Sequence, residues 1–146
     1  MLNASIVPSP LPRRLLTDDL GRRQDVSEVK RHWRDYRTSS GARPVRDFIM
    51  GCESEDRAAI AAAMYDIRAN GNKDGGGRHL QGPIWEVRVD GKAVIYRVLF
   101  ATVGSRGRIL LSLHAFKKKT QKTPKSAIDL AQRRLADWER RGTNAH

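Results

Sequence analysis

A chain of 146 residues, of which 39% are hydrophobic, is long enough to form one compact domain. It contains no run near the ~18 consecutive apolar residues that a membrane-spanning helix needs. Its single cysteine, Cys52, excludes an intramolecular disulfide and a zinc site built on several cysteines. We therefore expect a cytoplasmic protein that makes no contact with a membrane.

Charge is the strongest signal in the composition. The chain has 28 Lys and Arg against 16 Asp and Glu, which gives a net charge of +12 at pH 7. Residues 108–141 hold ten of the basic side chains and only three acidic ones. Such a concentration favours a polyanionic partner, which in the cytoplasm is usually nucleic acid. The alternative is a basic surface that serves only solubility.

The first half of the chain predicts an extension, a strand and two helices. Residues 1–25 contain three prolines and show no hydrophobic periodicity, which indicates an extension without regular structure. Residues 28–36 roughly alternate between apolar and polar side chains and predict an edge strand. Residues 44–50 begin with a proline and predict a short helix. Residues 53–71 begin with acidic side chains and end in an Asn-Gly pair, which predicts a longer helix.

The second half predicts a loop, three strands and a final helix. The glycine-rich residues 71–77 lack the Lys-Ser/Thr ending of a phosphate-binding loop and predict a flexible connection. Residues 85–89, 93–100 and 108–116 predict consecutive strands, and an Asp-Gly pair predicts a hairpin between the first two. Pro124 opens the last helix. The order predicts an α+β domain with a small, mostly antiparallel sheet, two N-terminal helices and a C-terminal helix.

Two arginines in the predicted sheet indicate an anion-binding site. Arg97 lies in an otherwise apolar strand, and a guanidinium is costly to bury without a partner. It therefore either pairs with a carboxylate such as Glu86 or faces a cleft where an anion binds. The hairpin makes Arg88 its approximate cross-strand neighbour. Because adjacent arginines repel each other, a phosphate between them would replace that repulsion with charge-assisted hydrogen bonds.

The end of the third strand adds a histidine and three lysines beside the same predicted surface. His114 titrates near neutral pH, and Lys117, Lys118 and Lys119 follow it. Taken singly, such a histidine is more often structural and such a lysine run is more often solvated. Together with the arginines they suit RNA cleavage, in which a ribose 2′-hydroxyl attacks phosphorus and fixed cations stabilise the developing charge. The sequence shows no Asp/Glu/His concentration typical of a metal site, and we expect no cofactor.

Three motifs in residues 28–139 resemble those of one toxin superfamily. They are a Leu-x-Gly…Trp-Glu-x-Arg strand, a Tyr-Arg strand and a His-x-Phe-x-Lys-Lys-Thr-x-Lys-Thr-Pro ending. This pattern is similar to the RelE/HigB toxins, and most similar to their phage-derived HigB-like branch. The resemblance implies a RelE-like fold and a type II toxin–antitoxin toxin that enters the ribosomal A site and cleaves translated mRNA without a metal. It also implies a helix-turn-helix, HigA-like antitoxin, through which alone the toxin would reach operator DNA.

The resemblance further implies a role for each site residue. Arg97 would stabilise the transition state, Arg88 would bind the phosphate and His114 would carry a proton. The catalytic group also includes Lys117, and the RNA-binding lysines are Lys118, Lys119 and Lys122. Several relatives place a tyrosine near the end of the site, whereas this chain has no tyrosine after Tyr96.

The boundaries and the alternatives complete the interpretation. We expect an extension over residues 1–25, a toxin domain over residues 26–141 and a tail over residues 142–146. Two other functions are consistent with the same charge pattern: a non-catalytic RNA- or DNA-binding module, and an inactive toxin relative that retains only protein interactions.

Overall fold

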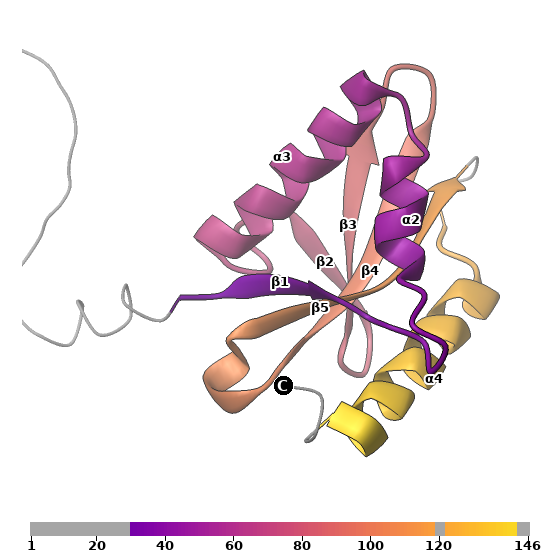
Figure 1. Ribbon diagram of the computed structural model, residues 1–146. Helices are drawn as coiled ribbons and strands as arrows, with labels where there is room; N and C mark the ends of the chain where they lie inside the picture. Colours follow the sequence, from indigo (N-terminus) through magenta and orange to yellow (C-terminus); the bar gives the residue numbers. More distant parts are fainter. Residues whose placement is uncertain (1–29, 119–121, 143–146) are drawn as a thin grey trace, which may run out of the picture. The chain divides into compact units, whose positions relative to one another are not determined.

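Figure 1 shows the computed structural model, which describes residues 30–118 and 122–142. The chain divides into two units between Lys30 and Arg31, and the described helices and strands belong to the second unit. The predicted extension over residues 1–25 lies outside the described residues, as do Lys119 and most of the predicted tail.

The described residues of the second unit form one five-stranded sheet and three α-helices. The elements in chain order are β1 (His32–Asp35), α2 (Pro44–Met50), α3 (Ser54–Asn70), β2 (Gly77–Gln81), β3 (Ile84–Asp90), β4 (Ile95–Val103), the 3-10 turn η1 (Ser105–Gly107), β5 (Ile109–Lys118) and α4 (Lys125–Gly142). None of the described helices combines the length and the apolar composition that crossing a membrane requires.

The α+β class is confirmed, but the sheet is mixed. Its strand order is β1-β5-β4-β3-β2. β3, β4 and β5 form the expected antiparallel meander, and β2 extends it by a fourth strand. β1 runs parallel to β5. Parallel strands need a long connection, and the chain between β1 and the antiparallel strands passes through α2 and α3. The arrangement of helices also differs in detail, since these two helices follow β1. The first strand of the meander, β2, was not predicted, because its residues adjoin the glycine-rich segment.

Helices cover both faces of the sheet and create two hydrophobic cores (Figure 1). On one face, α2 and α3 pack against Val87, Val98 and Phe100. On the other face, Ala131 and Leu135 of α4 belong to the core formed with neighbouring strand residues. Successive strand residues point to opposite faces, so a strand covered on both sides is apolar throughout. This explains why the predicted strand 93–100 has so few polar residues.

An irregularity in β5 re-aims the side chains near the end of this strand. Leu99 pairs with His114 but Phe100 pairs with Ser112, so Leu113 is an extra residue in the ladder. Leu113 belongs to the core under α4, and His114 stacks on Phe116, which packs against that same core. The bulge therefore turns two consecutive side chains toward the α4 face.

Candidate functional site

The two arginines that the sequence predicted as neighbours lie directly opposite each other. Arg88 on β3 pairs in register with Arg97 on β4, and Arg97 pairs in register with Phe116 on β5. The predicted cross-strand relation is thus confirmed. The three side chains form one row across the α4 face of the sheet, and in this row two guanidinium groups adjoin an aromatic ring.

Arg97 is held by a buried carboxylate. Its Nη1 donates to Oε1 of Glu86 at 2.7 Å, and the two side chains are only 3% and 2% exposed. The second carboxylate oxygen, Oε2, accepts a hydrogen bond from the hydroxyl of Thr123, in the segment that leads into α4. Both oxygens of Glu86 are therefore engaged. The pairing with Glu86 is one of the two alternatives that the sequence left open for Arg97.

A small cavity on the same face joins this ion pair to two further arginines. It has a volume of about 190 Å³ and is lined by Gly76, Arg78, Glu86, Arg88 and Arg97. We call it the arginine cavity. Three guanidinium groups and one carboxylate give its lining a net positive charge, and it is smaller than the ~300–1,000 Å³ of most small-molecule pockets. Its size and charge suit a single anionic group such as a phosphate.

Exposure divides the arginines of the cavity into two kinds. The Arg88 side chain is 47% exposed, and its contact with Asp90, at 3.3 Å, is itself exposed. Solvent-exposed pairs of this kind are weak, so Arg88 can exchange Asp90 for another anion at little cost. Arg78 is also exposed and pairs in register with Glu86. Arg78 and Arg88 can thus reach a ligand, whereas Arg97 supplies a positive charge that Glu86 fixes in place.

Sequence reasoning missed Arg78, because it treated the preceding glycines as a flexible loop. The segment is a hydrogen-bonded turn in which the N–H of Gly77 donates to the carbonyl of Asn72 at 2.7 Å. A Cβ on Gly77 would lie 2.4 Å from that carbonyl oxygen, so only glycine allows this approach to β2. The signal that was available is the Gly-Pro turn that follows the missed strand and makes a hairpin with β3.

His114 and Phe116 lie on the same face as the arginine cavity. Their rings are stacked, with centroids 5.0 Å apart and planes inclined by 25°. Burial lowers the pKa of His114, and the nearby positive charge of Arg134 lowers it further. The imidazole is therefore neutral at pH 7 and is able to accept a proton.

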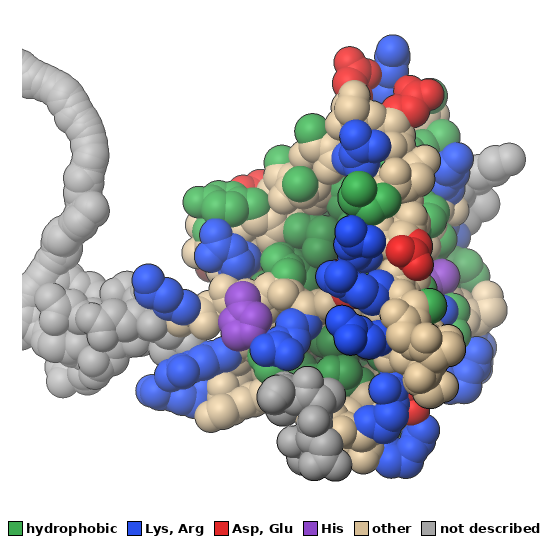
Figure 2. All heavy atoms as spheres, in the orientation of Figure 1, with side chains coloured by type: hydrophobic (Ala, Val, Ile, Leu, Met, Phe, Trp, Pro, Cys, Tyr) green, Lys and Arg blue, Asp and Glu red, His purple; other side chains and the backbone are tan. Residues whose placement is uncertain are grey.

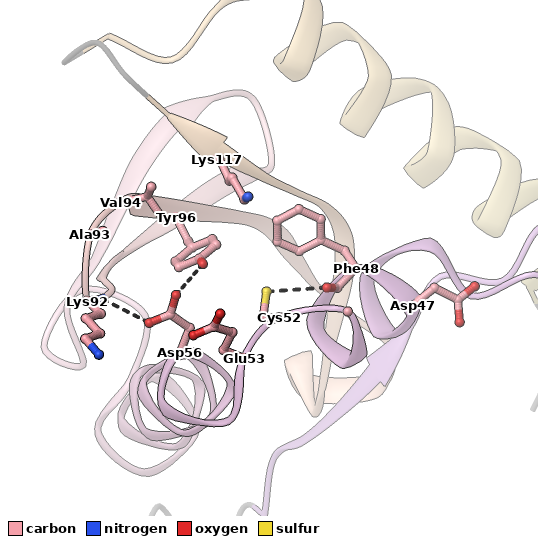
Figure 3. Close-up of a pocket in the computed structure, with 11 residues that line it drawn as sticks. Asp47, Phe48, Cys52, Glu53, Asp56, Lys92, Ala93, Val94, Tyr96 and Lys117 are labelled. Atoms are coloured by element: carbon pink, nitrogen blue, oxygen red, sulfur yellow. Dashed lines mark hydrogen bonds between the residues drawn. The ribbon is translucent and has the colours of Figure 1, made fainter.

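The predicted lysines do not all join this face. Lys117 pairs in register with Tyr96 and lines a separate pocket of about 620 Å³ on the face covered by α2 and α3 (Figure 3). In that pocket the Tyr96 hydroxyl donates to Oδ2 of Asp56 at 2.5 Å. The alternation of β5 sends Lys117 to this side and Lys118, which is buried, to the other. Lys122 is exposed just before α4.

Metal ligands are not concentrated in the described part of the chain. Residues 30–118 and 122–142 contain no group of three or more His, Cys, Asp or Glu side chains that could hold an ion. The arginine cavity instead brings together three arginines and Glu86, to which Thr123 donates a hydrogen bond.

The fold and the site define a small basic α+β domain with an arginine-lined cavity on one face of its sheet. The family model described as "Phage derived protein Gp49-like (DUF891)" matches residues 47–136, more than half of the chain, and the chain belongs to this family. The family is one of toxin–antitoxin toxins related to the RelE-like toxins. The matched stretch includes all the residues that line the arginine cavity. Among curated proteins, none matches the sequence significantly.

Proposed function

We propose that this protein is a HigB-like toxin of a type II toxin–antitoxin system, with a RelE-like topology, that cleaves translated mRNA on the ribosome. The observation that carries the proposal is the arginine cavity, in which two exposed guanidinium groups lie beside the fixed charge of Arg97. Membership of a toxin family supports the toxic role and implies an antitoxin partner. We assign the activity to the domain over residues 26–141 and take the antitoxin to be a helix-turn-helix protein of the HigA type.

The cavity suits cleavage by attack of the ribose 2′-hydroxyl on the adjacent phosphorus. In that reaction negative charge grows on the phosphoryl oxygens, and donors fixed before the reaction stabilise it without reorganising. Arg88 and Arg78 would bind the phosphate, because both are exposed at the cavity. Arg97 would stabilise the transition state through a charge that its bond to Glu86 holds in position. Because both oxygens of Glu86 already accept hydrogen bonds, we do not assign it the role of general base.

His114 is the proton acceptor in this proposal. Its lowered pKa keeps it neutral at pH 7, and the bulge in β5 turns it toward the α4 face. It lies two residue pairs along the ladder from the pair of Arg97 and Phe116, which places it diagonally across from Arg97, a position ~7–8 Å away in a sheet. Phe116 presents an aromatic ring on which a neighbouring base can stack.

The lysines would contact RNA outside the arginine cavity. Lys122 is exposed before α4 and would bind backbone phosphates, and we propose the same role for Lys119. Lys118 is buried, so its predicted contact with RNA would require its side chain to move. Lys117 lies on the opposite face. We therefore propose for Lys117 a contact with RNA that has passed the sheet edge, and no direct role in the cleavage step.

Expression of the toxin without its antitoxin tests the proposal. Induction should arrest growth and create new mRNA 5′ ends within translated regions. Arg88→Gln should relieve the arrest without unfolding the protein, because the Arg88 side chain is exposed and so is its ion pair with Asp90. Arg106→Gln is the matched control, since Arg106 is also exposed but lies in η1 and outside the lining of the arginine cavity.

The outcomes separate the competing functions. Full toxicity in a folded Arg88→Gln variant would remove the arginine cavity from the mechanism. Intact messages together with salt-sensitive RNA binding would indicate a non-catalytic RNA-binding protein instead. Arg97→Ala is a poor test by itself, because it leaves Glu86 buried without its partner and so confounds activity with stability.

A further inference from the structure

A second cationic cavity lies at the β1 edge of the sheet and has no part in the proposed cleavage. It has a volume of about 440 Å³ and is walled by β1, by residues that follow β1 and by the last turns of α4. Its lining residues are Trp33, Arg34, Asp35, Arg37, Arg43, Trp138 and Arg141. We call it the β1–α4 cavity. Figure 2 shows Lys and Arg side chains gathered over β1 and between β1 and α4.

The charge of this cavity is only partly compensated within the described structure. Arg43 pairs with Asp35 at 2.7 Å, and Arg141 pairs with Asp137. Arg34 and Arg37 are exposed, and neither forms an ion pair with any residue in the described ranges 30–118 and 122–142. The cavity therefore presents two guanidinium groups that are available to an external anion.

Two tryptophans give the cavity an aromatic lining. The Trp33 indole donates from Nε1 to the carbonyl of Met64 at 2.8 Å, and its ring meets Phe100 edge-on at 5.2 Å. Trp138 is partly buried against the core under α4. Both rings are thus held by packing while they line the cavity. Fixed aromatic rings beside arginines are the combination that binds single-stranded nucleic acid, since bases stack on the rings and phosphates pair with the cations.

We propose that the β1–α4 cavity is a second binding site for single-stranded RNA, in which Arg34 and Arg37 bind backbone phosphates and a base lies against Trp138. Trp138 and Arg34 belong to the α4 face, whereas Trp33 lines the cavity from the face covered by α2 and α3. The inference rests on RNA being the ligand of the proposed function, but it does not require cleavage. An acidic protein segment would use the charges alone and would leave the aromatic rings without a role, which favours RNA.

The two sites lie near opposite edges of the sheet. β1 and β2 are separated by four interstrand steps, and at ~4.8 Å per step this is about 19 Å. The nucleotide that occupies the β1–α4 cavity is therefore too far from Arg78 and Arg88 to be bound by them, although the same strand can extend from one site to the other. The second site would add affinity and fix the direction of the RNA without taking part in the chemistry.

Binding of a fluorescein-labelled single-stranded RNA to the full chain, measured over a range of salt concentrations, tests the inference. Each phosphate contact with a single strand contributes about 0.7 to the slope of log affinity against log salt, so Arg34→Gln/Arg37→Gln should reduce the slope by ~1.4. Arg68→Gln/Arg106→Gln removes two exposed charges that lie outside the linings of the arginine cavity and the β1–α4 cavity, and should leave the slope unchanged. RNA should also quench tryptophan fluorescence, and the quenching should be weaker in Arg34→Gln/Arg37→Gln.

Every result decides for or against the second site. An unchanged slope in Arg34→Gln/Arg37→Gln, or an equal loss in the control variant, would overturn it. A poly-glutamate peptide that displaces the RNA from this site with equal affinity would overturn the assignment to RNA and indicate an acidic protein partner. If Arg34→Gln/Arg37→Gln reduces the salt slope as expected but the toxin cleaves no mRNA, the proposed catalysis is wrong and the second binding site is supported. An equal unfolding midpoint for all variants confirms that a change in slope reports binding.

Discussion

The buried pair of Glu86 and Arg97 makes the sharpest prediction, through the substitution Glu86→Gln. Glutamine has nearly the same shape but no charge, and its amide places an NH2 group where one of the two carboxylate oxygens stood, so only one of the positions at which Arg97 and Thr123 donate keeps an oxygen. In this variant the Arg97 side chain, which is 3% exposed, has lost the negative charge that Glu86 provides. Removing one partner of a buried pair typically costs about 3–5 kcal/mol. That ranges from about a fifth to all of the ~5–15 kcal/mol that stabilises a typical domain.

The exposed pair on the same strand provides the matched control. Arg88 and Asp90 approach to 3.3 Å, but their side chains are 47% and 78% exposed. Exposed pairs contribute only about 0.2–1 kcal/mol, because water screens them and two long side chains must be ordered. Asp90→Asn should therefore have a far smaller effect than Glu86→Gln, although both substitutions replace a carboxylate with its amide in β3.

Urea unfolding measures the difference directly. With a slope of about 2 kcal/mol per molar urea, a loss of ~4 kcal/mol lowers the unfolding midpoint by ~2 M, whereas Asp90→Asn should lower it by ~0.5 M or less. The double variant Glu86→Gln/Arg97→Gln should be more stable than Glu86→Gln alone, because it removes the buried charge that the single substitution leaves behind. Midpoints for Glu86→Gln and Asp90→Asn that differ by less than the fitting error would refute the reasoning.

Two other predictions concern stability at separate places in the fold. Gly91→Ala should destabilise the protein by about 1–3 kcal/mol, because the new Cβ would lie 2.6 Å from Cε2 of Tyr96 and 2.9 Å from the carbonyl oxygen of Val94. Gly51→Ala is the control, because its Cβ would make only ordinary van der Waals contacts. Equal urea midpoints for the two variants would contradict this account. Asp137 has a pKa lowered to about 2, first by its hydrogen bond from Arg141. Because the folded-state pKa lies below the unfolded one, its contribution to stability is present above about pH 4 and is lost as the pH falls through about 2. Wild-type protein should thus be more stable than Asp137→Asn at about pH 5, the two unfolding curves should converge near pH 2, and a constant difference over this range would exclude the proposed linkage.

Local patterns in the sequence were sufficient for the helices, for four of the five described strands and for one essential register. The helix predicted over residues 53–71 is confirmed as α3. The prediction succeeded because Ile60 and Ile67 recur at helical spacing, and both are fully buried in the structure. The hairpin that brings Arg88 opposite Arg97 follows from an Asp-Gly pair between two alternating strands. Such features depend on residues close together in the chain, and so they can be recognised without knowledge of the remainder of the fold.

Contacts between distant parts of the chain decided the rest. Whether β1 would join the sheet beside β5, and parallel to it, depended on how the chain packs after α2 and α3. Whether Lys117 or Lys118 would share a face with Arg97 depended on the bulge at Leu113, because one extra residue exchanges the two sides of a strand.

The candidate site shows the same division. The sequence by itself determined that the protein would be basic, that its charge would gather near its C-terminal end and that two arginines would meet across a hairpin. Only the tertiary structure brought Arg78 to the cavity and placed the hydroxyl of Thr123 on Glu86. The physical reason is that a charge enters a folded interior only where partners from several elements converge on it, and this convergence is a property of the packed sheet and not of any one segment.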